Sequence, residues 1–215
     1  MNDSNLQTEL YLNWVQLMGE LGVAEDTAVP VWQRLLAGYE QDGRFYHNLA
    51  HIRQTLRIAH DLREEAAHFT AVQLALWFHD IVYDPTQQDN EEKSAMVAAQ
   101  ALFELNLAEV LIGEVVRLIL LTKTHVVMEQ DANGRVVIDA DLSGLGVPVE
   151  AYTAYSQAIR QEYAFVPDED YRNGRIQILQ HFLQRPTIYY TEPMRLIFEA
   201  QARQNISDEL AKLTA

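Results

Sequence analysis

The sequence predicts an all-α protein, folded as a single helical domain over residues 1–215. Apolar residues recur at steps of three and four through most of the chain, which is the spacing of one face of an α-helix. Only 9 glycines and 6 prolines occur in 215 residues, fewer than many short, turn-linked strands would require. A hydrophobic content of 48% is enough for a substantial core and argues against general disorder.

Helices are predicted in succession along the first half of the chain. One face of the first consists of apolar residues at helical spacing: Leu6, Leu10, Trp14, Leu17 and Leu21. Pro30 opens a second that runs to Tyr39, because the fixed backbone angle of proline suits a first helical turn. Further helices are expected at 51–62, 70–82, 91–106 and 108–122, with a polar loop at 84–90. The helix at 70–82 is almost entirely apolar up to His79, so we expect it at the centre of the core.

The segment around Asn133-Gly134 admits two interpretations. Because it lies between two short runs rich in valine, this dipeptide would suit the turn of a β-hairpin. We favour a loop followed by a helix that carries Ile138 to Leu142. Later helices are predicted at 148–164, 168–184 and 192–204.

Composition limits the expected partners and compartment. With 31 acidic residues against 16 Lys and Arg, the formal net charge is −15, unlike the basic surfaces that bind nucleic-acid polymers. The absence of cysteine excludes disulfides, thiol nucleophiles and Cys-ligated metals. The N-terminus lacks a signal pattern, and no apolar run reaches the roughly 18 residues of a membrane span. We therefore expect a cytoplasmic protein without a membrane partner.

Histidine and aspartate residues follow or end several of the predicted helices. His47 and His51 are four residues apart, which would place both on one face of a helix. The doublet His79-Asp80 ends the apolar helix, where burial is costly unless a partner such as a divalent cation compensates for it. Together with Asp141, these imidazoles and carboxylates suit Mn, Fe, Co, Ni or Zn. Each also suits a structural role, such as a hydrogen-bonded pair or a helix cap, so both interpretations stay open.

The order of these residues resembles the HD superfamily of metal-dependent phosphohydrolases, named for its His…His-Asp…Asp pattern. Segments 46–51 (Tyr-His-Asn-Leu-Ala-His) and 140–143 (Ala-Asp-Leu-Ser) are similar to motifs of the cyclic nucleotide phosphodiesterase branch, and 122–125 loosely resemble a third. The resemblance covers about residues 44–143. The purine-binding glutamine and aromatic region of that branch has no counterpart in 144–215. The whole chain is therefore more similar to small bacterial predicted HD-type phosphohydrolases.

The resemblance implies an HD-type helical bundle, completed by the helices of 148–215, and a set of site residues. His51, His79, Asp80 and Asp141 would ligate one or two divalent ions (Mn, Mg, Fe, Co, Ni or Zn), and Asp80 could bridge two. His47 would be the general acid that protonates the leaving oxygen. The implied reaction is hydrolysis of a small nucleotide or other phosphomonoester by metal-activated water. The alternative is a non-catalytic HD module that acts as a nucleotide sensor or structural protein, and a homodimer is left open.

Further candidates surround this set. Asp84 and Glu92 follow the doublet at positions where HD enzymes keep acidic groups that hold ligands or water. Lys123 and His125 end a helix that we expect to point at the same pocket. Arg175 carries a guanidinium suited to phosphate. Structural alternatives stay open for each: a solvated loop, a first helical turn, a helix cap or a surface ion pair.

Overall fold

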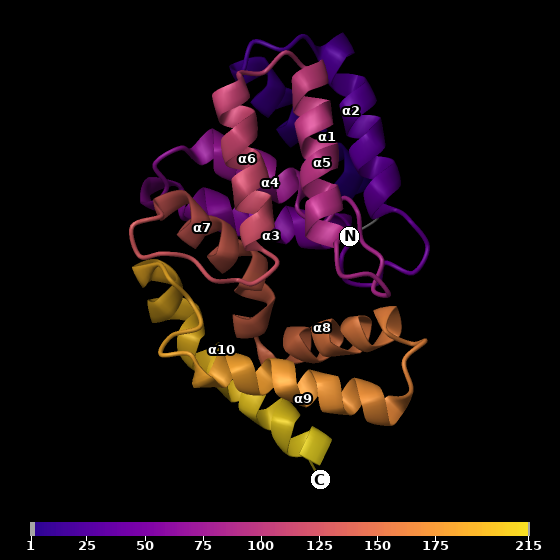
Figure 1. Cartoon of the computed structure of the whole chain (residues 1–215), viewed down its shortest axis with the longest axis vertical. Coiled ribbons are helices and arrows are strands. Elements are labelled where there is room, and N and C mark those ends of the chain that lie inside the picture. The colour runs from indigo at the N-terminus through magenta and orange to yellow at the C-terminus, as the bar shows by residue number, and fades with distance from the viewer. Residues whose placement is uncertain (1–2, 215) are drawn as a thin grey trace.

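The computed structural model describes residues 3–214, and this range is helical with no strand, which confirms the all-α prediction (Figure 1). Two short 3₁₀ helices, η1 (Arg63–Glu65) and η2 (Leu142–Gly146), separate some of the α-helices. The α-helices of the described range follow in this order: α1 (Asp3–Glu20), α2 (Glu25–Tyr39), α3 (Leu49–Asp61), α4 (Phe69–Phe78), α5 (Asn90–Glu104), α6 (Glu109–Leu121), α7 (Ala132–Asp141), α8 (Val149–Glu162), α9 (Asp168–Gln184) and α10 (Glu192–Thr214).

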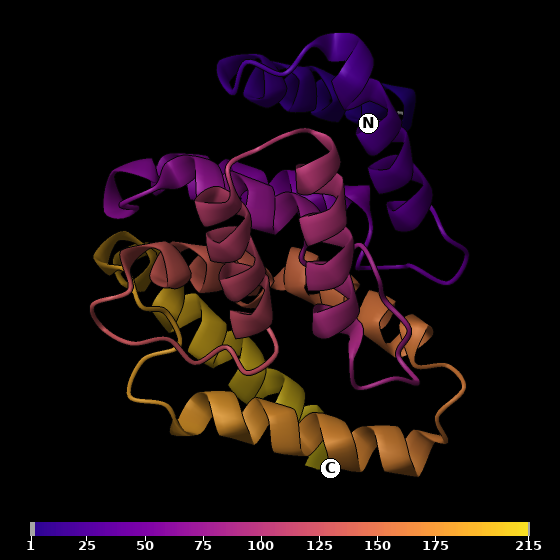
Figure 2. The ribbon, with the colours of Figure 1, turned by 45° about the horizontal axis from the view of Figure 1, so that its top comes forward.

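The helices form a body and a separate layer. Figures 1 and 2 show α1 and α2 at one end and α8, α9 and α10 gathered at the other, with α3 to α7 between them. The C-terminal layer packs onto this body chiefly where α10 contacts η2. Within 3–214, no helix combines the length and the apolar character needed to span a bilayer.

Helix α4 lies at the centre of the body, as its apolar sequence predicts. It packs against α3, α5, α6 and α7, and its residues from Leu74 to Phe78 are fully buried. Trp77 meets Trp14 and Trp32 edge-on, with ring centroids 5.7 and 6.1 Å apart. Edge-to-face packing of this kind adds to the apolar burial that holds α1 and α2 on the body.

The end of α4 differs from the prediction of a helix reaching residue 82. The helix ends at Phe78, because the guanidinium of buried Arg44 donates to the carbonyls of Asp80 (2.6 Å) and Ile81 (2.9 Å). These hydrogen bonds satisfy the two carbonyls, which in a continuing helix would instead accept from backbone N–H groups four residues later. The doublet His79-Asp80 therefore lies in a turn and not within the helix.

Two other predicted helices prove longer at one end. Helix α2 begins at Glu25 and contains Pro30, whose missing N–H leaves only the carbonyl of solvent-exposed Asp26 without its helical donor. Helix α10 runs to Thr214 and not to 204. Asn205 and Ile206, just beyond the predicted end, are buried, and Asn205 donates to the carbonyls of Leu145 and Val147.

The Asn133-Gly134 dipeptide lies neither at the turn of a β-hairpin nor in the loop that was predicted to precede a helix. Both residues lie in the first turn of α7. The carboxylate of Asp131 accepts a hydrogen bond from the backbone N–H of Gly134 at 2.9 Å, which caps the helix. This N-terminal cap outweighs the turn preference of the dipeptide.

A buried ion pair fastens the three helices of the C-terminal layer together. Arg175 of α9 donates twice to Glu209 of α10, at 2.8 and 3.1 Å. The same carboxylate accepts from the hydroxyls of Tyr152 and Ser156 on α8, at 2.5 and 3.1 Å. Burial alone would raise the pKa of Glu209, but the hydrogen bond and charge of Arg175 outweigh it and lower the pKa.

This shift predicts how acid weakens the layer. A carboxyl whose pKa is lowered by folding contributes stability above its unfolded pKa, about 4.3, and that contribution is lost as the pH falls through the folded pKa. We expect Glu209→Gln to lower the free energy of unfolding at pH 7 by about 3–5 kcal/mol, because Arg175 loses its buried partner. Urea unfolding of both proteins between pH 7 and pH 3 should give a shallower acid decline for the variant. Parallel declines would contradict the assignment.

Candidate metal centre

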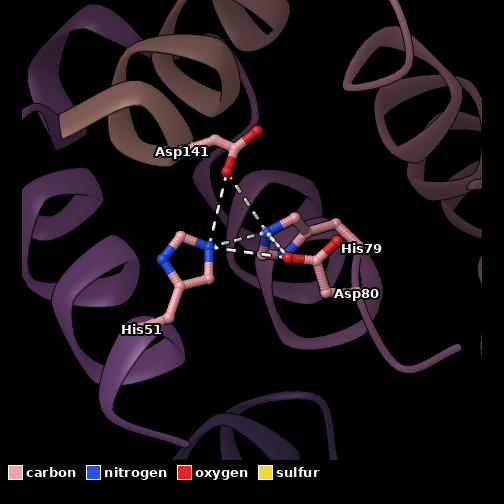
Figure 3. A group of neighbouring side chains, drawn as sticks. All are labelled: His51, His79, Asp80 and Asp141. Carbon is pink, nitrogen blue, oxygen red and sulfur yellow. Dashed lines mark hydrogen bonds and ion pairs between the residues drawn. The ribbon is translucent and has the colours of Figure 1, made fainter. Parts of the chain in front are cut away.

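Four of the predicted ligands meet in the body of the protein. His51 comes from the first turn of α3, His79 and Asp80 from the turn after α4, and Asp141 from the last residue of α7. Figure 3 shows both rings and both carboxylates pointing toward one another. One ligand atom from each residue lies within 4.8 Å of all the others. The structure thus brings together residues separated by up to 90 positions, and this group could hold a metal ion.

The distances suit a shared cation. His51 Nε2 lies 3.2 Å from His79 Nε2 and 3.4 Å from Asp141 Oδ1, and His79 Nε2 lies 3.1 Å from Asp80 Oδ2. Two donors that each bind one ion at about 2.1 Å, at angles of 90–110°, are about 3.0–3.5 Å apart. The chemistry of the donor set, two imidazoles and two carboxylates, fits Zn, Mn, Fe, Co or Ni.

The surroundings fix how the ligands face the centre. His79 Nδ1 donates to the carbonyl of Leu76 at 2.9 Å, because a carbonyl can only accept, and this leaves Nε2 to bind a cation. The side chains of His51 and His79 are 2% and 1% exposed, whereas those of Asp80 and Asp141 are 18% and 14% exposed. The imidazoles therefore close the centre from inside, and the carboxylates open it to solvent.

A metal ion at this group competes with a proton on His79, so the electrostatics of the group make metal binding depend on pH. Burial alone would raise the pKa of Asp80, but the charges of His79 and His47 outweigh it, and the pKa is lowered. Burial would lower the pKa of His79, but the charge of Asp80 dominates and raises it well above its ordinary value. A metal ion must displace the His79 proton, so its affinity falls as the pH falls.

His47 lies next to this group, but not where its spacing predicts. The prediction that His47 and His51 share a helical face is wrong, because Asn48 caps α3 and the helix begins only at Leu49. The Asn48 side chain accepts from the N–H of Ala50 at 2.9 Å, as Asn commonly does at a helix start. The two imidazole rings are still neighbours, with centroids 5.9 Å apart.

Glu162, the last residue of α8, holds His47 in place. One carboxylate oxygen accepts from His47 Nδ1 at 2.6 Å, and the other accepts from the backbone N–H groups of Tyr46 and His47. Burial would lower the pKa of His47, but the charge of Asp80 and the hydrogen bond to Glu162 outweigh it and raise the pKa. The ring also stacks on Tyr83 at 4.1 Å. His47 is thus a fixed imidazole whose protonated form is favoured.

Sequence reasoning missed Glu162. The available indication was its position three residues after Ile159 and ten after Tyr152, which places a carboxylate on the buried face of α8. A buried carboxylate requires a partner, but the sequence does not reveal that the partner lies 115 residues earlier.

A cleft of about 730 Å³ opens over this centre, between the body and the C-terminal layer. His47, Asp80, His125 and Asp141 line one side. The opposite side consists of apolar and aromatic residues from α8, α9 and the turn between them: Tyr155, Ile159, Tyr163, Val166, Tyr171, Ile178 and Phe182. Its volume suits a small-molecule ligand.

Three comparisons with known proteins found no match. No protein-family model, curated protein or solved structure matched the chain. The resemblance to the HD superfamily therefore stays a prediction from motifs, and any functional argument depends on the residues of this chain.

His125 and Lys123 both line the cleft, as predicted, but they lie in the turn that follows α6 and not in the helix itself. His125 has a φ of 51°, which is uncommon for a non-glycine residue, and its Nε2 lies 3.1 Å from Asp141 Oδ2. Arg185 and Tyr190 hold its carbonyl at 3.0 and 2.9 Å. The C-terminal layer thereby fixes a strained residue whose ring contacts the metal centre.

The remaining candidates are bound to other protein groups and not to the metal centre. Glu92 forms an ion pair with Lys123, which also donates to the carbonyl of Gln88. Arg175 lines the cleft, but its guanidinium is bound to Glu209. Asp84 is exposed, is absent from the cleft lining, and accepts from the N–H and hydroxyl of Thr86 in its own loop.

Proposed function

We propose that this protein is a metal-dependent phosphohydrolase that cleaves a phosphoester of a small molecule. The proposal is supported by one observation: a four-residue group that could hold a metal ion lies beside His47, a fixed imidazole whose protonated form is favoured, and residues of both line one cleft. A structural metal site needs neither a ligand-sized cleft nor a third imidazole held by a buried carboxylate. The motif resemblance to HD phosphohydrolases supports the same reaction class.

The residues divide the chemistry between them. His51, His79, Asp80 and Asp141 would hold a divalent cation. Such a cation supplies Lewis acidity, which activates water and neutralises charge on a phosphoryl group. His47 would donate the proton of its Nε2 to the leaving oxygen, because Glu162 occupies Nδ1 and the ring lines the cleft. Glu162 would stabilise the imidazolium before transfer and keep the ring oriented afterwards.

Chelation tests the proposal directly. We expect hydrolysis of a panel of phosphomonoesters and phosphodiesters to cease after treatment with a chelator and to return with Mn²⁺, Co²⁺, Ni²⁺ or Mg²⁺. Metal analysis of protein purified without a chelator should find a divalent ion in each chain. Metal-bound protein that hydrolyses no phosphoester would favour a non-catalytic role, and turnover that resists the chelator would remove the metal from the reaction.

A further inference from the structure

The cleft has few cations free to bind additional phosphate. Among the described residues that line it, the lysines and arginines are Lys123 and Arg175. Lys123 is paired with Glu92, and Arg175 is paired through two hydrogen bonds with buried Glu209. Either would have to leave a carboxylate to bind a phosphoryl group.

The acidic residues of the cleft strengthen this restriction. Glu91 and Asp170 line it in addition to Asp80 and Asp141. A cation at the metal centre would compensate for one phosphoryl group close to Asp80 and Asp141. A second or third phosphoryl group would extend toward carboxylates with no unpaired cation to offset the repulsion.

The side of the cleft opposite the metal centre has a different character. Tyr155, Tyr163, Tyr171 and Phe182 present aromatic rings there, and Ile159 lies among them. Tyr163 and Tyr171 are neighbours, with centroids 6.2 Å apart, and Phe182 lies 6.2 Å from the ring of His125. At least one ring of this aromatic wall, that of Phe182, therefore lies beside His125, which contacts Asp141 of the metal centre. Such surfaces favour flat, uncharged ring systems.

We infer that the cleft selects a phosphoester with one phosphoryl group on an uncharged, flat ring-bearing moiety, as in a nucleoside monophosphate. The phosphoryl group would lie at the metal centre and the ring against the aromatic wall. This inference rests on the proposed function and narrows its substrate class. It excludes nucleoside polyphosphates and small phosphoesters without a ring as preferred substrates.

Relative turnover tests the charge argument. With Mn²⁺-loaded protein, kcat/KM should be at least about tenfold higher for AMP than for ADP or glycerol phosphate, the scale of one missing favourable contact. Glu92→Gln should free Lys123 and raise kcat/KM for ADP relative to AMP severalfold. Equal turnover of AMP and ADP, or of AMP and glycerol phosphate, would overturn the inference and leave the proposed hydrolysis intact.

Two glycines provide a matched test of the aromatic side. Gly174 of α9 lines the cleft and Gly113 of α6 does not, and a Cβ added to either meets nothing within 4 Å. Leucine at either position suits an α-helix better than glycine, so both variants should fold, which thermal unfolding can verify. Only Gly174→Leu would project a side chain into the space assigned to the ring.

Binding of adenosine, which carries no phosphate, separates this inference from the proposed function. With a chelator present, adenosine should bind the parent and Gly113→Leu equally in equilibrium dialysis, and Gly174→Leu at least about tenfold more weakly. This readout requires neither metal nor turnover. Failure of adenosine to bind the parent, or equal binding by Gly174→Leu, would overturn the aromatic wall as the ring site. If the parent binds adenosine but the Mn²⁺-loaded parent hydrolyses no phosphoester, the result would instead count against the proposed function.

Discussion

Replacing His79 or Asp80 with alanine is expected to abolish metal binding, as measured by metal content after purification without a chelator. Each residue contributes one of the four ligand atoms of the group, so its removal would leave a metal ion with only three of them. Metal that binds only the native state at about 1,000 times its Kd stabilises by about 4 kcal/mol. In a chain of this size that corresponds to roughly 8–16 °C in Tm.

The diagnostic quantity is the change in Tm caused by a chelator. We expect the parent to lose stability when the metal is removed and the two variants to show no change. His60→Ala is a suitable control, because His60 is an exposed histidine at the other end of the helix that carries His51. This control should keep both the metal and the chelator response. Parental metal content in His79→Ala would contradict the ligand assignment.

His47→Ala is expected to keep the metal and to lose turnover by roughly 10²–10⁴-fold, the usual scale of general acid catalysis. The loss should shrink for a nitrophenyl phosphate, whose leaving group needs little protonation. Steady-state kinetics with a good and a poor leaving group, together with metal analysis, measure both effects. An equal loss for the two substrates would reassign His47 to positioning, and loss of metal would make it a ligand.

Glu162→Gln provides the finer test of the same pair. Glutamine keeps an oxygen that can accept from the backbone of residues 46 and 47 but removes the charge that helps to raise the pKa of His47. The acid form of His47 should then be lost at a lower pH. We therefore expect the alkaline limb of the pH–rate profile to move to lower pH for the poor leaving group, with metal content unchanged.

The sequence predicts most of the fold because helical periodicity is a local property. The apolar run that becomes α4 needs no knowledge of its neighbours to be assigned to the core. Its end at Phe78 could not be predicted, because Arg44, far away in sequence, binds the carbonyls that follow. The capped start of α7 was hidden for another reason: Asn133-Gly134 suits a turn in isolation, and only the Asp131 cap decides against it.

The metal centre was predictable only as a set of residue types. Asp139 and Asp141 are alike in sequence, yet Asp139 is fully buried and accepts from the backbone of Tyr190 and Thr191, whereas Asp141 joins His51 and His79. Spacing alone cannot distinguish a carboxylate that anchors a loop from one that faces a cation. Spacing likewise does not distinguish Tyr152, which is buried, from Tyr155 on the same helix, which lines the cleft.

The division of the cleft between two stretches of chain has a consequence for how such a protein can diverge. The residues that could hold a metal lie between 51 and 141, and the aromatic wall between 155 and 182. If the protein has the proposed function, substitutions in α8 and α9 would change substrate preference and leave the metal-holding residues and His47 unchanged. Glu162 is the exception, because it belongs to the wall's own helix yet holds His47. Under the proposed function, substrate preference would therefore diverge through the other positions of α8 and α9, while Glu162 would be retained.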